Sequence, residues 1–248
     1  MKKNYTKLGA AKNGKIKRGN LIVIDGIDGS GKATQVALLK KRLEKMKVKV
    51  KTIDFPRYND NFFGDLLGRY LSGEYGDFIA IDPRVASVLY AADRFESSAK
   101  IAGWLADGYT VIADRYVSAN QIHQGGKISD TKKRDEFLSW LEKMEHSIFC
   151  IPKPDLVIYL DVPFEVSKEW IERKIATRKK NKHAEGRVDV AEANLLHLKH
   201  SRNAALDLAT RNKNWQKVEC CKDMVCMMPE QVSEHVFKIV SKKIGLKK

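Results

Sequence analysis

The stretch that most constrains the fold of this chain is LIVIDGIDGSGKATQ, residues 21–35. Its apolar start, Leu21–Ile24, is typical of a strand covered on both faces, and apolar residues recur at helical spacing after it. Between these two patterns stand Gly26, Gly31 and Lys32, at the spacing that lets backbone N–H groups surround a phosphate while the lysine reaches its outer oxygens. We therefore predict a strand, a phosphate-binding loop (the P-loop) and a helix.

The P-loop indicates that the chain binds a nucleoside triphosphate, because a mere glycine turn would not need the flanking strand and helix. One position departs from the usual pattern, since Ala33 stands where such loops carry a Ser or Thr hydroxyl for Mg²⁺. Thr34 would point elsewhere on the helix. The residues expected to contact ATP are Gly26, Ile27, Asp28, Gly29, Ser30, Gly31, Lys32, Ala33 and Thr34.

The net charge of +15 lies mainly in two segments. Residues 1–20 contain seven basic and no acidic residues, and residues 173–187 contain seven basic residues and one acidic residue. Nucleic-acid binding usually requires a basic face across the fold, so nucleic acid is an unlikely partner. Residues 1–19 have too few large apolar side chains to fold and are predicted to be a flexible basic arm.

The cysteines and the apolar pattern point to a cytoplasmic protein. The sequence shows neither a signal-peptide pattern nor a long apolar span, so we expect no membrane contact. In a reducing compartment disulfides are rare. Because Cys220, Cys221 and Cys226 lack the spacing of a zinc site, we predict that they are buried free thiols.

Strand and helix patterns alternate along the chain, which favours a parallel sheet covered on both faces. The predicted strands are residues 21–24, 48–53, 111–113, 156–162 and 215–219. We predict an α/β fold of the P-loop NTPase type, with three α/β/α layers and a mostly parallel five-stranded sheet. Residues 20–248 would form this single domain, with a basic lid over about residues 174–188.

The helix expected from Pro83 to about Lys100 carries two faces. Its core stripe is predicted to be Val85, Val88, Leu89, Ala92 and Phe95. Tyr90 and Arg94 are four residues apart and therefore share a face roughly opposite that stripe. This second face could be an exposed amphipathic surface or part of a binding site.

Further motifs follow the predicted strands in a defined order. They are FPRY (55–58), LYAADRF (89–95), DRYVSANQ (114–121) and PKPDLVIYLDVP (152–163), followed by the basic segment and by Asp189 and Glu192. Over about residues 21–209 the chain resembles the thymidylate kinase family of P-loop nucleoside-monophosphate kinases. The resemblance implies an ATP:dTMP phosphotransferase that makes dTDP for dTTP biosynthesis, with ATP and dTMP as its substrates.

The resemblance also assigns roles in phosphoryl transfer, which requires two polyanions in line and neutralisation of the transferred charge. Lys32 and the loop amides would hold the ATP phosphates. Arg57 and Arg115 would bind the acceptor phosphate through their planar guanidinium groups. Since the loop contains no arginine, the closing charge is expected from the lid. The expected catalytic residues are Asp28, Lys32, Arg57, Arg115, Arg178 and Arg187.

Base recognition is expected from the second face of the helix that begins at Pro83. By resemblance, Tyr90 stacks on thymine in place of a phenylalanine, Arg94 donates to a base carbonyl and Asn120 meets the pyrimidine edge. His123 stands where relatives often have a tyrosine near the sugar, which leaves discrimination against a ribose 2′-hydroxyl open. The predicted dTMP site comprises Asp28, Phe55, Arg57, Tyr58, Tyr90, Arg94, Arg115, Asn120 and His123.

Magnesium is the expected cofactor, with ATP as co-substrate. By resemblance, Asp28 binds the acceptor sugar or a magnesium-bound water, and Asp114 orders the metal shell, both partly through water. The phosphates and these acids could hold the ion although Ala33 lacks a hydroxyl. Asp114 could instead form a structural ion pair with Arg115 or another neighbour.

Two other functions stay open from the sequence. Tyr90 and His123 also suit a kinase for another pyrimidine or a modified deoxynucleoside monophosphate. Ala33 and the basic arm suit a non-catalytic P-loop protein that binds nucleotide or nucleic acid, although the intact phosphate-binding lysine and arginines count against it. The family resemblance further implies a homodimer to which the helix of Tyr90 contributes.

Overall fold

The computed structural model describes residues 17–180 and 195–246, with side chains for 17–173 and 196–246. Its core is a sheet of five strands in the order β2-β3-β1-β4-β5, and all four pairings are parallel. The strands are β1 (Leu21–Asp25), β2 (Val50–Asp54), β3 (Thr110–Asp114), β4 (Leu156–Asp161) and β5 (Trp215–Glu219). The predicted α/β fold is confirmed, because parallel neighbours must be joined by crossovers, which here are helical.

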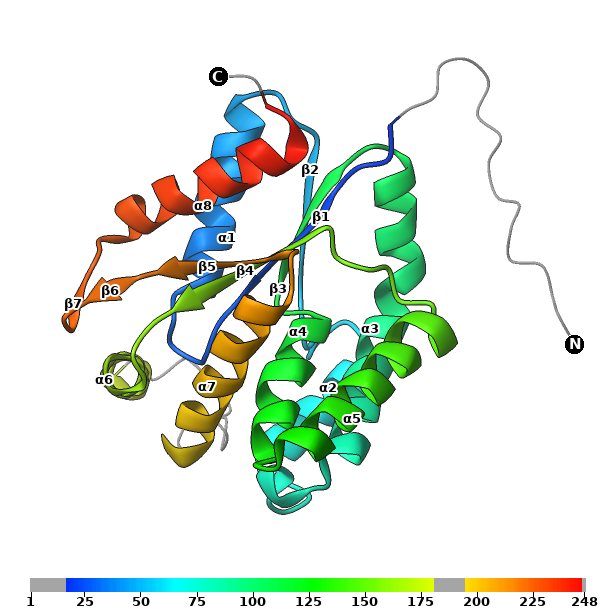
Figure 1. Cartoon of the computed structure of the whole chain (residues 1–248), viewed down its shortest axis with the longest axis vertical. Coiled ribbons are helices and arrows are strands. Elements are labelled where there is room, and N and C mark those ends of the chain that lie inside the picture. Colours follow the sequence, from blue (N-terminus) through cyan, green and yellow to red (C-terminus); the bar gives the residue numbers. More distant parts are fainter. Residues whose placement is uncertain (1–16, 181–194, 247–248) are drawn as a thin grey trace, which may run out of the picture.

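Side chains alternate between the two faces of the sheet, so each strand contributes to two cores. Leu21 and Val23 pack with residues of α3 (Pro83–Ala106) and α7 (Leu195–Arg211). Ile22 and Ile24 pack with residues of α1 (Lys32–Lys45) and α8 (Pro229–Ile244). Figure 1 shows the three layers, with the blue α1 and the red α8 on one side of the sheet and α7 and α3 on the other.

The remaining elements connect these layers. They are α2 (Phe62–Leu71), α4 (Val117–Ala119), α5 (Thr131–Glu142), α6 (Phe164–Lys180), the 3₁₀ turns Phe78–Ala80 and Gly125–Lys127, the π-helices Asn120–Gln124 and Lys143–Ile148, and the hairpin strands β6 (Cys221–Lys222) and β7 (Val225–Cys226). Both π-helices continue a preceding α-helical segment, and widened turns of this kind often occur at functional sites.

The predicted faces of α3 are wrong. Val85, Val88 and Phe95, assigned to the core, are 55%, 40% and 53% exposed. The face of Ala91 and Arg94 is buried instead. Polar side chains on this face find hydrogen-bond partners inside the protein, so hydrophobic spacing alone does not identify the buried face.

The prediction of free thiols is also wrong for two cysteines. Cys221 and Cys226 lie opposite each other in the β6–β7 hairpin and form a disulfide, because the short turn brings their side chains together. Cys220 is a buried free thiol, and burial, with the nearby Asp161, raises its pKa to about 12. Cys150 is a free thiol at the surface.

The ends of the predicted arm and lid differ from expectation where they are described. Arg18 pairs with Asp155 at 2.9 Å, and the Gly19 N–H donates to the Leu105 carbonyl, so the chain is docked before residue 20. Helix α6 continues to Lys180, and the predicted lid loop is therefore helical over residues 174–180. Residues 1–16 and 181–194 lie outside the described part. No helix among the described residues is long and apolar enough to cross a membrane.

Candidate functional site

The P-loop connects β1 to α1 in a conformation that depends on glycine. Gly29 has φ 78°, and a Cβ atom there would lie 2.9 Å from the Ser167 carbonyl oxygen. Gly31 has φ 83° and forms the N-cap of α1. L-residues with side chains rarely adopt these angles. The N-terminus of α1, with its partial positive charge, therefore faces the loop, as anion binding requires.

Lys32 is held inside this loop. Its ammonium group donates to the carbonyl oxygens of Gly26 (3.0 Å) and Ile27 (2.9 Å). Burial, together with the positive charge of Arg115, lowers the pKa of Lys32 to about 8, although the carboxylates of Asp28, Asp114 and Asp25 oppose the shift. The lysine is thus placed to exchange these carbonyl oxygens for phosphate oxygens.

A second cavity borders the outer side of the P-loop. Its lining residues are Ser30, Gly31, Thr34, Gln35, Trp170, Cys220, Met227, Pro229 and Val232. Ser30 Oγ is buried and has no hydrogen-bond partner among the described residues. The cavity therefore combines an apolar wall of tryptophan and methionine with an unsatisfied hydroxyl next to the phosphate-binding loop.

Another pocket, which we call the acceptor pocket, has about 650 Å³ of space open to solvent and is lined by Asp28 of the P-loop. It brings together eight residues predicted from the sequence: Asp28, Phe55, Tyr58, Tyr90, Arg94, Arg115, Asn120 and His123. It is also lined by residues that the sequence did not suggest: Pro56, Leu71, Phe78, Ile79, Ala119, Gln124, Lys127 and His197. Residues from all parts of the chain thus meet at the carboxyl edge of the sheet, where open α/β folds bind ligands.

One part of the acceptor pocket is formed by Asp28 of the P-loop and by Arg115 and His123 beside it. Arg115 has φ 62°, an unusual angle for an arginine, and its guanidinium forms an ion pair with the Asp28 carboxylate. Its second amino group donates to His123 Nε2 at 3.0 Å. We call this cluster the phosphate end.

Neighbouring charges and burial set the protonation states of the side chains at the phosphate end. Burial alone would raise the pKa of Asp28, but the positive charges of Arg115 and Lys32 hold it well below its usual range. Burial, together with Arg115, lowers the pKa of His123 far below its usual value. His123 is therefore neutral and accepts the arginine hydrogen bond, while its ring stacks on His197 at 5.5 Å.

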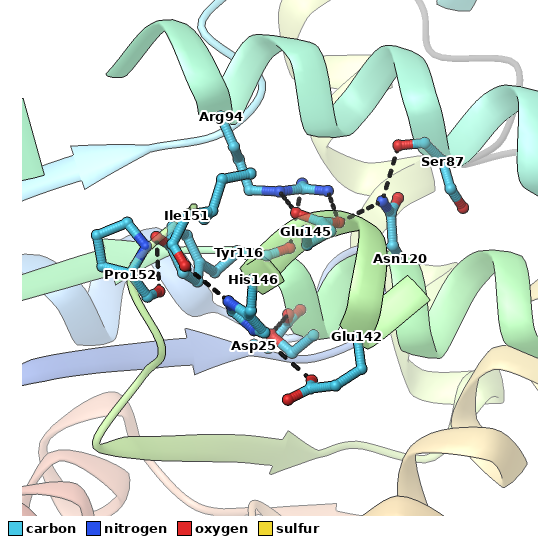
Figure 2. A network of polar contacts seen from close by, with 11 residues as sticks. Asp25, Ser87, Arg94, Tyr116, Asn120, Glu142, Glu145, His146, Ile151 and Pro152 are labelled. Carbon is cyan, nitrogen blue, oxygen red and sulfur yellow. Dashed lines mark hydrogen bonds and ion pairs between the residues drawn. The ribbon is translucent and has the colours of Figure 1, made fainter. Parts of the chain in front are cut away.

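Another part of the pocket is built on a buried ion pair, shown in Figure 2. Arg94 donates to both carboxylate oxygens of Glu145, from Nε at 2.8 Å and from Nη2 at 2.5 Å. Asn120 Nδ2 donates to Glu145 Oε1 at 2.9 Å and to the Ser87 carbonyl at 3.2 Å. We call this cluster the base end. Tyr90 lies near it on α3, with its ring 5.8 Å from that of Phe78.

Glu145 is the most informative residue that sequence reasoning missed. It stands in the π-helix that follows α5 and is fully buried, although its neighbourhood in the sequence reads as a polar helix surface. The widened turn rotates it inward, and no sequence pattern signals such a turn. Gln124, Lys127 and His197 were also missed, because none belongs to a recognisable motif.

Arg57 is the predicted acceptor residue that does not line the pocket. Its guanidinium binds Asp60 at 2.6 Å and Asp54 at 3.3 Å, while its backbone N–H donates to Asp93. It nevertheless sits between the pocket residues Pro56 and Tyr58. Of the predicted lid arginines, Arg178 belongs to α6 but its side chain is not described, and Arg187 lies outside the described residues.

Carboxylates that could serve a metal ion surround the Lys32 ammonium. Asp25, Asp28 and Asp114 all interact with it electrostatically, and burial raises the pKa of both Asp25 and Asp114. The described residues contain no group of three or more His, Cys, Asp or Glu side chains arranged to hold an ion. Oxygen donors without a complete cage fit Mg²⁺, which usually binds through one or two carboxylates together with substrate phosphates and water.

Comparison with known proteins relates the sequence of this chain to thymidylate kinases. Residues 24–223 match the family model described as thymidylate kinase. The thymidylate kinase of Mycobacterium tuberculosis (strain CDC 1551 / Oshkosh) is 33% identical over 150 residues, which cover 60% of this chain and 69% of the relative. That of Plasmodium falciparum (isolate 3D7) is 30% identical over 170 residues, covering 66% and 74%.

The fold has a counterpart among solved structures. The thymidylate kinase of Candida albicans superposes with a TM-score of 0.68 at 23% identity, covering 91% of this chain and 92% of that protein. At this identity the likeness concerns the fold alone. It agrees with the α/β fold described above.

Proposed function

The chain belongs to the thymidylate kinase family of nucleoside-monophosphate kinases, and we propose that it transfers the γ-phosphoryl group of ATP to dTMP to form dTDP. One observation carries the proposal. The acceptor pocket gathers eight of the nine residues predicted to bind dTMP, among them the P-loop residue Asp28 and its ion-pair partner Arg115. An acceptor phosphate would thus face the donor phosphates.

The phosphate end supplies the acceptor-phosphate site. Arg115 would exchange the Asp28 carboxylate for the dTMP phosphate, since a phosphate offers the same planar guanidinium two oxygens and more charge. Asp28 would then be released toward the sugar or a metal-bound water. We also propose that Arg57 turns from Asp54 and Asp60 toward the same phosphate.

The base end and the aromatic wall supply the thymine site. Tyr90 would stack on the pyrimidine, and Arg94 would donate to a carbonyl of the base. Phe78 and Leu71 pack in one cluster with Tyr90, Ile79 also lines the pocket, and these side chains would surround the apolar methyl group of thymine. This combination favours a pyrimidine, because aromatic side chains can stack on its ring while Arg94 and Asn120 form hydrogen bonds with its polar groups.

The transfer itself needs charge and position more than covalent chemistry. Lys32 and the amides of the P-loop would bind the ATP phosphates, and Arg178 and Arg187 of the lid would stabilise the charge on the moving phosphoryl group. Mg²⁺, held by Asp28 and Asp114 largely through water, would neutralise the phosphates. The cavity beside Ser30 would receive the adenine of ATP.

ADP release, measured with ATP and a panel of dTMP, dUMP, dCMP, UMP and dGMP, tests the proposal. We expect the highest kcat/KM with dTMP. A clearly higher value for another nucleotide would assign a different acceptor to the same pocket. No ADP release with any of the five would contradict a kinase function.

We further propose that the protein is a homodimer that associates through the exposed face of α3. Val85, Val88 and Phe95 form an exposed apolar stripe on this helix, and Phe149 extends it by packing on Phe95 with ring centroids 5.5 Å apart. Burying this stripe against a second copy would brace the helix that carries Tyr90. Sedimentation should show a dimer that Phe95→Glu converts to a monomer; a monomeric wild type at micromolar concentration would contradict the proposal.

A further inference from the structure

We propose that Glu145 is a positioning residue that determines base specificity: it fixes Arg94 as a donor and Asn120 as an acceptor toward the pocket. The pocket then selects pyrimidines that carry a carbonyl next to an N3–H group, such as thymine and uracil, over cytosine. This inference rests on the proposed function for the reaction, but concerns how the base is read.

Glu145 reaches the substrate only through its two partners. Its side chain is fully buried and does not line the acceptor pocket, whereas Arg94 and Asn120 both do. The pair crosses from α3 to the π-helix after α5, and Asn120 comes from the other π-helix. Three segments distant in the sequence are thus held together by one carboxylate (Figure 2).

The orientation of the Asn120 amide follows from its neighbours. A carboxylate and a backbone carbonyl can only accept hydrogen bonds, so the NH₂ group must face Glu145 and Ser87. These two contacts use both hydrogens of Nδ2. Only the carbonyl oxygen of the amide is left to interact with a ligand, and Asn120 therefore presents an acceptor to the pocket.

Arg94, in contrast to Asn120, can present only hydrogen-bond donors to the pocket. Its Nε and Nη2 groups donate to Glu145, and Nη1 donates to the Tyr116 carbonyl at 3.3 Å. Of the five N–H groups of a guanidinium, at most two remain, one on each Nη atom. Since a guanidinium cannot accept, Arg94 offers the pocket donors only.

A donor beside an acceptor matches one class of pyrimidine edge. Thymine and uracil present the O4 carbonyl as an acceptor and N3–H as a donor, which pair with Arg94 and Asn120 respectively. Cytosine presents an amino group, which donates, and an unprotonated N3, which accepts. Arg94 would therefore face a donor and Asn120 an acceptor. Sites built to hydrogen-bond one group reject the analogue strongly, because buried polar groups are left unpaired.

The cost of burying the pair supports a role in recognition. The Arg94 and Glu145 side chains are 2% and 0% exposed. Apolar residues of similar volume are often as stabilising as such a pair, so stability alone gives no reason for it. A role in recognition gives such a reason, because Glu145 Oε1 accepts hydrogen bonds from both Arg94 and Asn120, the two residues that face the base.

The test measures kcat and KM for dTMP, dUMP and dCMP with the wild type and with Glu145→Gln. The glutamine side chain places its own NH₂ group against a donor of Arg94 or Asn120, so one of the hydrogen bonds to residue 145 is lost. For dTMP we expect kcat/KM to fall about 10- to 100-fold, mainly through KM, since charged hydrogen bonds are lost. For dCMP, which does not use these contacts, we expect a change below about threefold.

Two further variants separate specificity from folding. Glu142→Gln makes the same change one turn earlier, at a surface carboxylate that binds Lys153. It should leave kcat/KM for all three substrates unchanged. Glu145→Asp keeps a carboxylate that only accepts, so its dTMP-to-dCMP ratio should lie between those of the wild type and Glu145→Gln. Thermal melting confirms that each variant is folded; if Glu145→Gln is not, the Glu145→Asp ratio decides.

The ratio of kcat/KM for dTMP to that for dCMP is the deciding quantity. A merely structural role would lower kcat/KM for both substrates by the same factor, so an unchanged ratio in a folded variant overturns the inference. If the wild type releases no ADP at all, the proposed reaction fails, and dissociation constants for dTMP and dCMP from calorimetry replace kcat/KM. A wild type that binds or phosphorylates dCMP as well as dTMP would also overturn the inference, while leaving a kinase function intact.

Discussion

Two arginine–carboxylate pairs border the acceptor pocket, and the pairs differ in exposure. At the base end, the Arg94 and Glu145 side chains are 2% and 0% exposed and joined by two hydrogen bonds. At the phosphate end, Arg115 and Asp28 are 20% and 9% exposed, and Arg115 also contacts His123. The same chemical pair therefore stands once behind the pocket wall and once on it.

This difference explains how one pocket can both select a base and bind a phosphate. We expect the base-end carboxylate to remain with its arginine when substrate binds, so that the donors and acceptors are already in place. The phosphate-end carboxylate occupies the position that we assign to the substrate phosphate and must yield it. The first pair is a permanent part of the site, and the second is an exchangeable one.

The largest expected effect comes from breaking the permanent pair. Arg94→Met leaves a buried carboxylate without its counter-charge, which typically costs about 3–5 kcal/mol of folding free energy. Urea unfolding monitored by circular dichroism measures this loss. The double variant Arg94→Met/Glu145→Leu should recover most of it, and a double variant as unstable as the single one would contradict the proposed pairing.

The exchangeable pair should affect activity more than stability. Arg115→Met removes charged hydrogen bonds to the acceptor phosphate, so kcat/KM for dTMP should fall about 10²- to 10³-fold. Initial rates at saturating ATP measure this value, with unfolding free energy as the control. A loss of stability as large as that of Arg94→Met, with little change in kcat/KM, would reverse the roles of the two ends.

The pH dependence of ATP use should report Lys32, which lies beside the exchangeable pair. Burial lowers the pKa of Lys32 to about 8 in the free protein, and we propose that its ammonium form binds the ATP phosphates. The kcat/KM for ATP should be constant below this pKa and fall about tenfold per pH unit above it, because that parameter reports the free enzyme. Lys32→Arg, which stays charged, should lose this decline even if its overall rate is lower.

The smallest effect on catalysis is expected from the disulfide, which belongs to neither end. Cys221→Ser opens the β6–β7 hairpin, whose cysteines are separated by five positions, and should cost at most about 2 kcal/mol of stability by loop entropy. The kcat/KM for dTMP should be unchanged in the same assay. A clear decrease would show that the hairpin and the acceptor pocket are coupled.

The features that could be predicted from sequence are those with local signals. The P-loop, the strand Leu21–Asp25 and the motifs around Arg115 have fixed spacing, and the parallel sheet follows from their alternation with helices. The buried face of α3 could not be predicted, because Arg94 is buried by a partner 51 positions away in the sequence. Glu145 could not be found either, since only a π-turn directs it inward.

The central claim is that the base end is formed before substrate binds, whereas the phosphate end rearranges. Proton–nitrogen NMR of arginine side chains tests it most directly, with Arg94→Met and Arg115→Met to assign the signals. We predict that the Arg94 Nε–H signal is visible and protected from water exchange in the free protein and hardly moves on addition of dTMP. The signals of Arg115 should shift strongly. An Arg94 signal that appears only with dTMP would contradict the account.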